Sequence, residues 1–212
     1  TTDLSDAAVC SAVASACSIA GFTQSDDCAG LVDAELMATD YPHLDLHHPW
    51  DIDTPAAIEL AQRCEAAARG YDPRITNSEG ASLSSHEGVS IYGNTHGFIG
   101  CYAGTRHSLS CSVIASEGDD MQRDYWYSSS RNADSLLDAE SIGRIAAQRS
   151  VERLQPRQVK TQTAPVLYTP EMARSLLGHF IGAIRGGALY RKASFLLDKK
   201  GEQLFPDFFQ LQ

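Results

Sequence analysis

The polar and apolar positions of the chain follow a strand pattern from Arg74 to Ser129. Within Arg106–Ala115, histidine, leucine, cysteine and valine alternate with arginine and serine at every second position. This alternation is typical of a strand with one face on a core. Residues 118–120 predict a turn, and Met121–Ser129 predicts a further strand with three consecutive aromatic residues.

The segment Tyr71–Gly97 combines strand-forming residues with glycines every few positions. It predicts two or three short antiparallel strands separated by bends. Its polar positions are too dense for a closed core, so we expect an exposed ribbon that captures peptide. The candidate peptide-binding residues here and on the next strand are Asn77, Glu79, Asn94, His96, Arg106 and His107.

Helical periodicity occupies most of the remaining chain. An N-capped helix is expected from Asp3 to Gly21, a short one near Cys28–Met37, and an alanine-rich one from Thr54 to Gly70. Later helices are expected at Asp138–Leu154 and Pro170–Ile184, a buried strand at Ala164–Tyr168, and a strand with turns at Tyr190–Phe205. The order predicts an α+β fold, with an antiparallel, curved or barrel-like sheet and flanking helices.

Three regions follow from this order. Residues 1–72 form the helical part of an N-terminal domain, and 73–160 form its antiparallel sheet and a helix. Residues 161–212 begin a C-terminal domain that is cut short. The chain starts without Met and ends on PDFFQLQ with exposed-type aromatics, so we expect an internal piece of a longer protein.

Composition narrows the classes of function. The net charge of -10 and the lack of a basic run argue against binding of nucleic acid. No apolar run is long enough for a membrane span, and Thr1–Ile19 lacks the basic start of a signal peptide. The six cysteines form no CxxC pair and are expected to be small buried hydrophobes. These features predict a cytoplasmic protein.

The histidines do not form the helical zinc motif His-Glu-x-x-His. His86-Glu87 is the one His-Glu pair, and Ser90 and Ile91 stand where the second histidine would be needed. Adjacent His47 and His48 are either a loop metal site or a surface loop. His107 either bonds a substrate or bridges the sheet. We therefore expect no catalytic residue and no metal ligand in this chain, with an unusual site at His47, His48 or His107 as the alternative.

The helix Pro170–Ile184 carries a stripe of small residues, Ser175, Gly178 and Gly182. Glycine inside a helix costs about 1 kcal/mol relative to alanine. Close approach of another backbone would compensate this cost. The stripe is either tight packing on a sheet or an interface with a subunit or substrate.

Four stretches together resemble the TldD/PmbA family, closer to its PmbA (TldE) branch. They are RITNSEGASLSSHEGVSIYGNTHGF, TRHSLSCSVIA, DMQRDYWYSSSR and GGALYRKASFLLDKKGE. The likeness runs from Asp3 to the end, and family members are about twice as long. The resemblance implies a cytoplasmic zinc metallopeptidase system that processes unfolded peptides of the antitoxin or microcin-precursor type. It also implies assembly with a TldD-like subunit or as a homodimer.

The same resemblance places the family's zinc helix on this chain. Ser194 through Gly201-Glu202 matches the segment after that helix, which sets Leu177, Gly178 and Gly182 at the positions of the His-Glu-x-x-x-His motif. None can bind zinc or activate water. The resemblance therefore implies a non-catalytic partner, with zinc in the TldD-like subunit. The alternative is a client-binding adaptor, such as a gyrase modulator or an antitoxin binder, without peptidase activity.

Overall fold

The computed structural model describes residues 2–26 and 29–210, and divides into two compact units, 1–156 and 157–212. Each unit is described by itself. Among the described residues, no helix has both the length and the apolar character that a bilayer span requires.

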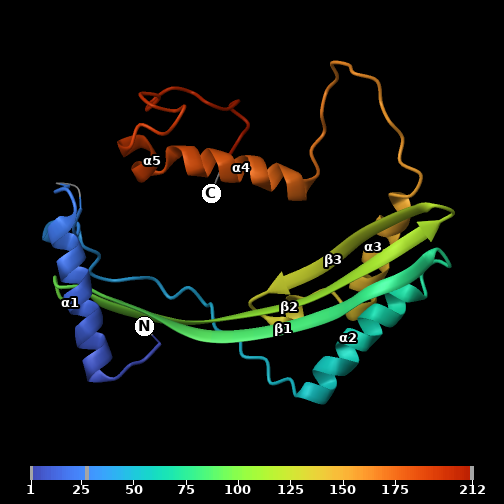
Figure 1. Cartoon of the computed structure of the whole chain (residues 1–212), viewed down its shortest axis with the longest axis horizontal. Coiled ribbons are helices and arrows are strands. Elements are labelled where there is room, and N and C mark those ends of the chain that lie inside the picture. The colour runs from blue at the N-terminus through green and yellow to red at the C-terminus, as the bar shows by residue number, and fades with distance from the viewer. Residues whose placement is uncertain (1, 27–28, 211–212) are drawn as a thin grey trace. The chain divides into compact units, whose positions relative to one another are not determined.

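The first unit is built on an antiparallel sheet of order β1-β2-β3, with β1 (Ile75–Gly93), β2 (Ile99–Glu117) and β3 (Asp120–Ser130). The curved sheet with flanking helices confirms the expected α+β class (Figure 1). The two or three short strands predicted for Tyr71–Gly97 are wrong, because β1 is one strand of 19 residues. Its glycines are accommodated inside the ladder, and the only register shifts lie between Ile75 and Gly80.

The three strands differ in length, and this decides the shape of the unit. β3 pairs with β2 only as far as His107↔Ser130, whereas β1 pairs with β2 along its whole length. Beyond β3, the strands β1 and β2 therefore continue as a two-stranded ribbon (Figure 1). A two-stranded ribbon buries little apolar surface by itself.

Two helices cover one face of the sheet where it has three strands (Figure 1). They are α2 (Thr54–Arg69), capped by Asp53 and Gly70, and α3 (Ala139–Glu152), capped by Asp138. Asp53 and Asp138 each accept a backbone N–H from the first turn of their helix. The alternating residues of β2 meet these helices, so Leu109, Cys111, Val113 and Ala115 are buried against Cys64, Ala68, Ile142 and Ala146.

The cysteine expectation is only partly correct. Cys64 and Cys111 are buried, and a hydrogen bond from the Cys64 thiol to Cys111, together with burial, raises the pKa of Cys64. Cys10, Cys17 and Cys101 are exposed, because α1 and the ribbon are not covered in this structure. Cys28 lies outside the described residues.

The N-terminal helix α1 (Asp6–Phe22) begins later than expected. Ser5, rather than Thr2 or Asp3, is its cap, and none of its residues is buried. Of the helix expected near Cys28–Met37, the described residues contain only the 3-10 turn η1 (Ala34–Leu36). A second such turn, η2 (Ala133–Ser135), follows β3.

The second unit contains α4 (Pro170–Ile184) and α5 (Gly186–Tyr190). The bounds of α4 are those that its sequence predicts. The strands expected at Ala164–Tyr168 and Tyr190–Phe205 are wrong, since the first has no strand partner and the second forms turns after α5. Phe205 packs edge-on against Phe180 and stacks on Phe209, with ring centroids 4.8 and 4.3 Å apart.

The helices α2 and α3 approach each other closely at Gly143. A Cβ built there would lie 2.1 Å from the carbonyl oxygen of Cys64. We expect Gly143→Ala to lower the free energy of unfolding by about 2 kcal/mol, because the α2 backbone must shift. Urea unfolding followed by tryptophan fluorescence measures this, since Trp50 and Trp126 both lie in the first unit.

Gly178→Ala in α4 is the matched control, because a Cβ there meets no atom within 4 Å. It should leave the same unfolding midpoint unchanged. Equal midpoints for Gly143→Ala and the wild-type chain would contradict the close packing of the two helices.

Candidate functional site

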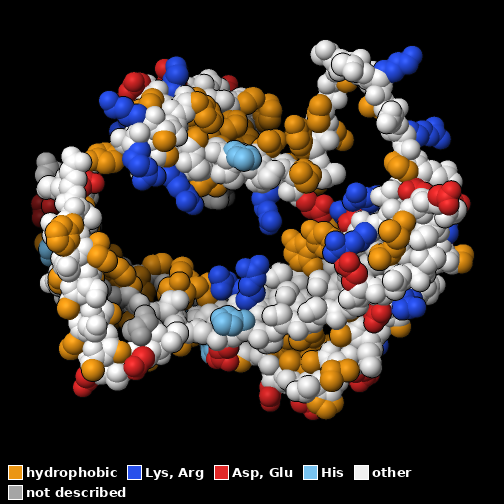
Figure 2. Space-filling view, in the orientation of Figure 1, with side chains coloured by type: hydrophobic (Ala, Val, Ile, Leu, Met, Phe, Trp, Pro, Cys, Tyr) orange, Lys and Arg blue, Asp and Glu red, His pale blue; other side chains and the backbone are white. Residues whose placement is uncertain are grey.

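The ribbon formed by β1 and β2 is polar on one side and apolar on the other. Cross-strand pairs His86↔Arg106 and Ser84↔Ser108 lie on the polar side, away from the helices. Pairs Val89↔Ala103 and Ile91↔Cys101 continue the helix-covered side beyond the helices. Figure 2 shows hydrophobic side chains gathered over the part of the ribbon that extends beyond β3.

A segment without regular secondary structure, residues 41–48, runs along this apolar side and is fixed at Thr105. The N–H of Thr105 donates to the carbonyl of Leu46 at 2.9 Å, and the N–H of His48 donates to Thr105 Oγ1 at 2.9 Å. The same hydroxyl donates to the carbonyl of Arg131 at 2.8 Å. Buried Thr105 therefore joins the segment, β2 and the chain just after β3.

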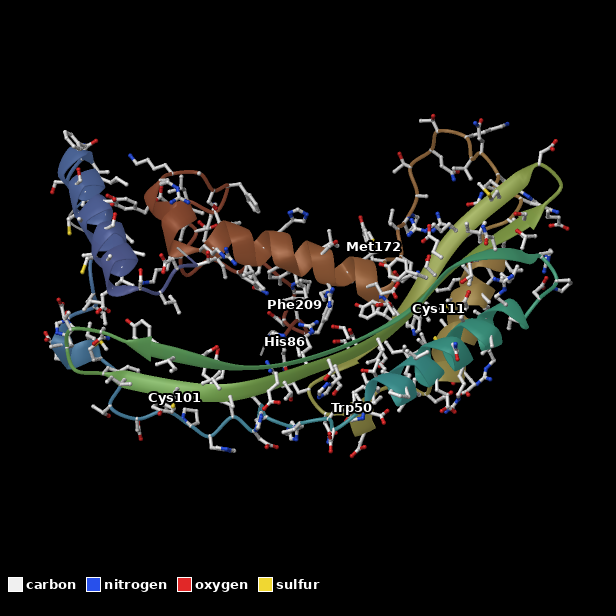
Figure 3. The ribbon with its side chains drawn as sticks, turned by 60° about the horizontal axis from the view of Figure 1, so that its bottom comes forward. Trp50, His86, Cys101, Cys111, Met172 and Phe209 are labelled. Carbon is white, nitrogen blue, oxygen red and sulfur yellow. The ribbon has the colours of Figure 1, made fainter. Side chains whose placement is uncertain are left out.

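His107 completes this attachment. Its side chain is 1% exposed, with Nδ1 2.9 Å from Ser85 Oγ and Nε2 3.0 Å from the carbonyl of His48. The ring of Trp50 meets it edge-on at 5.4 Å between centroids. In Figure 3, Trp50 lies on the opposite side of the ribbon from His86. With both ring nitrogens engaged, His107 matches the sheet-bridging alternative rather than a peptide contact.

The other two histidines of the alternative metal site, His47 and His48, each contact a different partner. His47 Nε2 lies 2.6 Å from Glu87 Oε1, and His48 Nε2 lies 3.0 Å from the carbonyl of Asp45. Within residues 2–26 and 29–210, no group of three or more His, Cys, Asp or Glu side chains is arranged to hold a metal. The described residues of this loop therefore do not fit a zinc site.

Between residues 41–47 and the ribbon lies a pocket of about 600 Å³. Segment 41–47 contacts β2 at one end through Leu46 and Thr105, and at the other end the ring of Tyr41 meets Phe98, just before β2, edge-on at 6.0 Å between centroids. The pocket walls between these contacts are mainly apolar: Leu44, Ile91, Tyr92, Cys101, Tyr102 and Ala103 contribute to them. Its size is that of ordinary ligand sites in proteins.

The residues expected to bind peptide are not brought together. Asn77 lies near the start of β1 and Asn94 just after its end, on the order of 50 Å apart along an extended strand. Glu79 forms an ion pair with Arg123 at 2.7 Å and accepts from Ser112 Oγ. Asn94 accepts the N–H of His96 in the turn between β1 and β2.

Arg106 is exposed on the polar side of the sheet, where its Nε donates to Ser129 Oγ at 3.2 Å. Of the residues that line the pocket, only His47 is a candidate from sequence, as a ligand of the alternative metal site. The signal that points to them is the apolar alternation of Val89, Ile91 and Ile99, which continues past the last residue covered by a helix.

In the second unit, α4 presents the stripe Ser175, Gly178 and Gly182 without a close neighbour. A Cβ at either glycine meets no atom within 4 Å, and Ser175 Oγ donates to the carbonyl of Met172. His179 is exposed. Leu177, Gly178 and Gly182 offer no ligand atom, so this helix does not fit a zinc ion.

Comparison with known proteins identifies the class as metallopeptidase-family domains. Residues 47–154 match the model of the PmbA/TldA metallopeptidase central domain, and residues 161–212 match that of the C-terminal domain. The chain is 48% identical over its full length to the metalloprotease PmbA of Escherichia coli O157:H7, and 47% identical to a PmbA homolog of Haemophilus influenzae. Both alignments span 47% of the relative, so the chain covers about half the length of these relatives.

Solved structures agree with these matches. A proposed modulator of DNA gyrase from Bacteroides thetaiotaomicron superposes with a TM-score of 0.82 at 26% identity, covering 94% of this chain and 46% of that one. A second from Thermotoga maritima shares the fold, with a TM-score of 0.70 at 19% identity, over 76% of this chain and 38% of that one. The chain belongs to the PmbA/TldD family.

The contacts of His107 predict a structural role. Substitution of His107 should therefore affect stability more than substitution of the adjacent, exposed Arg106. We expect His107→Leu to lower the free energy of unfolding by about 2 kcal/mol, because the carbonyl of His48 loses its donor and segment 41–48 loses one of its attachments to β2. Urea unfolding measures the loss.

Arg106→Ala is the control one residue away, on the exposed side. Its unfolding midpoint should stay within the range of surface substitutions, about 0.5 kcal/mol. A His107→Leu chain as stable as Arg106→Ala would refute the structural role.

Proposed function

We propose that this chain is part of a PmbA/TldE-like subunit of a cytoplasmic zinc metallopeptidase system, and that the subunit is the non-catalytic partner of a TldD-like chain. The observation that carries the proposal is the sequence of α4, which has Leu177, Gly178 and Gly182 where the family resemblance sets the zinc motif. Membership of a metallopeptidase family without the ligand residues suits a subunit that binds substrate while its partner cleaves it.

The role assigned to the subunit is capture of unfolded peptides, of the antitoxin or microcin-precursor type. A long antiparallel ribbon with free strand edges supports this role, since extended peptides add to such edges by main-chain hydrogen bonds. Exposed Asn77, His96 and Arg106 remain proposed peptide contacts. The stripe on α4 at Ser175, Gly178 and Gly182 is the proposed contact with the TldD-like subunit or, in a homodimer, with a second copy.

A second candidate is a client-binding adaptor without peptidase activity. The structural likeness to a proposed modulator of DNA gyrase favours it. The two candidates differ in their partner. Co-purification with a TldD-like chain supports the peptidase system, and a stable client complex formed without that chain supports the adaptor.

The decisive measurement is the zinc content of the full-length protein purified alone. We expect well under 0.1 zinc per chain by elemental analysis, and peptide cleavage only after a TldD-like chain is added. A ratio near one zinc per chain that survives mild chelation, or cleavage by the protein alone, would overturn the proposal.

Gly178→Glu in α4 tests the subunit contact in the same preparation. A charged side chain in the small-residue stripe should abolish co-purification with the TldD-like chain. Glu171→Gln at the start of the same helix, which adds no bulk, is the control and should leave co-purification intact.

A further inference from the structure

The strand β2 has a free edge where it passes the apolar pocket. In a regular antiparallel strand, the N–H and C=O of one residue point to the same edge, and successive residues alternate between the two edges. The N–H of Thr105 points away from β1, because it donates to Leu46. The register of β1 and β2 contains no shift from Gly80 to Gly93, so the backbones of Cys101 and Ala103 also point away from β1.

These backbone groups have no partner in the described part of the chain. β3 ends opposite His107, and segment 41–46 makes its one backbone hydrogen bond with β2 at Thr105. The N–H and C=O of Cys101 and Ala103 therefore border the pocket unpaired. Four adjacent backbone groups of this kind are the complement of another extended chain.

The side chains and charges around this edge of β2 indicate the chemical character of an extended peptide that would pair with it. Leu44 and Ile91 are more than half exposed and form apolar walls on the two sides of the pocket. The pocket lining contains Asp45 but neither Lys nor Arg. Residues 1–62 hold eleven acidic residues and also lack Lys and Arg. An occupant with an apolar side chain and flanking positive charges fits this environment.

We propose that the pocket between residues 41–47 and β2 binds an extended cationic peptide, which pairs with Cys101 and Ala103 and inserts an apolar side chain between Leu44 and Ile91. This inference rests on the proposed peptide-capturing function, and assigns the capture to the inner edge of β2 rather than to the outer edge of β1.

Two proline substitutions separate these edges. Val89 and Ala103 lie directly opposite each other, and the N–H of each points away from the other strand. Proline removes the N–H, and at these two positions it removes no hydrogen bond between β1 and β2. Ala103→Pro blocks the inner edge, and Val89→Pro is the matched control on the outer edge.

The probe is the end-blocked, fluorescein-labelled peptide Lys-Thr-Lys-Leu-Lys-Thr-Lys, and the readout is fluorescence anisotropy with the full chain alone. We expect Ala103→Pro to weaken binding at least tenfold and Val89→Pro to change it less than twofold. An unchanged affinity for Ala103→Pro, or an equal loss for both variants, would overturn the assignment.

Changes in the peptide test the same site with the protein unaltered, which covers the case of a proline variant that does not fold. N-methylation of the leucine and of the lysine after it removes backbone donors, and should weaken binding at least tenfold. A peptide with Glu in place of Lys should also bind at least tenfold more weakly. Equal binding of the N-methylated peptide would refute strand pairing, and equal binding of the Glu peptide would refute selection by charge.

Failure of this inference is distinct from failure of the proposed function. A chain that binds zinc but shows the expected peptide and proline effects overturns the non-catalytic role and retains the pocket. A zinc-free chain that depends on a TldD-like partner but shows no proline effect retains the non-catalytic role and overturns the pocket as the peptide site.

Discussion

The structure of the first unit depends on how β2 is paired after β3 has ended. A strand in a sheet presents backbone groups on both edges, and those that lose their neighbour need another partner or exposure to water. Thr105 is the first residue of β2 past the end of β3 whose N–H points to that edge, and Leu46 supplies its acceptor. The remaining attachments of segment 41–48, through His48 and His107, follow from this bond. This bond is the backbone hydrogen bond that holds segment 41–46, which forms one wall of the pocket, against β2.

Much of the fold could be predicted because its information is local. The alternation in Arg106–Ala115 identifies the buried face of β2, and the caps of α2 depend on residues within one turn. The predictions that were wrong concern non-local support. Glycines in β1 are typical of bends, but β1 pairs with β2 along its whole length, and only Gly80, with φ +95°, lies at a register shift. Ala164–Tyr168 is strand-like in composition, yet a strand exists only where a neighbour pairs with it.

The candidate site could be predicted far less well, because its walls are about fifty residues apart in the sequence. The pattern of apolar residues marks Ile91 as one that faces the helix-covered side, but it cannot show that residues 41–47 lie against it. His107 illustrates the same limit. Alternation places its side chain on the inner face, whereas the choice between bonding a substrate and bridging the sheet depends on where the carbonyl of His48 lies. The expected peptide contacts share polarity, but polarity does not indicate proximity, and the length of β1 and β2 separates Asn77 from Asn94.

The proposed function assigns different roles to the two units. A catalytic zinc helix requires ligands on one helical face, and the residues of α4 that the family resemblance sets at the motif positions, Leu177, Gly178 and Gly182, offer none. Small residues on an exposed helix face permit a close approach of another backbone. The proposed capture of peptide by the first unit does not require zinc ligands. Strand edges bind peptides through main-chain groups, which do not depend on side-chain identity. Under this proposal, a subunit whose α4 offers no zinc ligand at these positions can still present a strand edge to substrate, while a partner chain supplies cleavage.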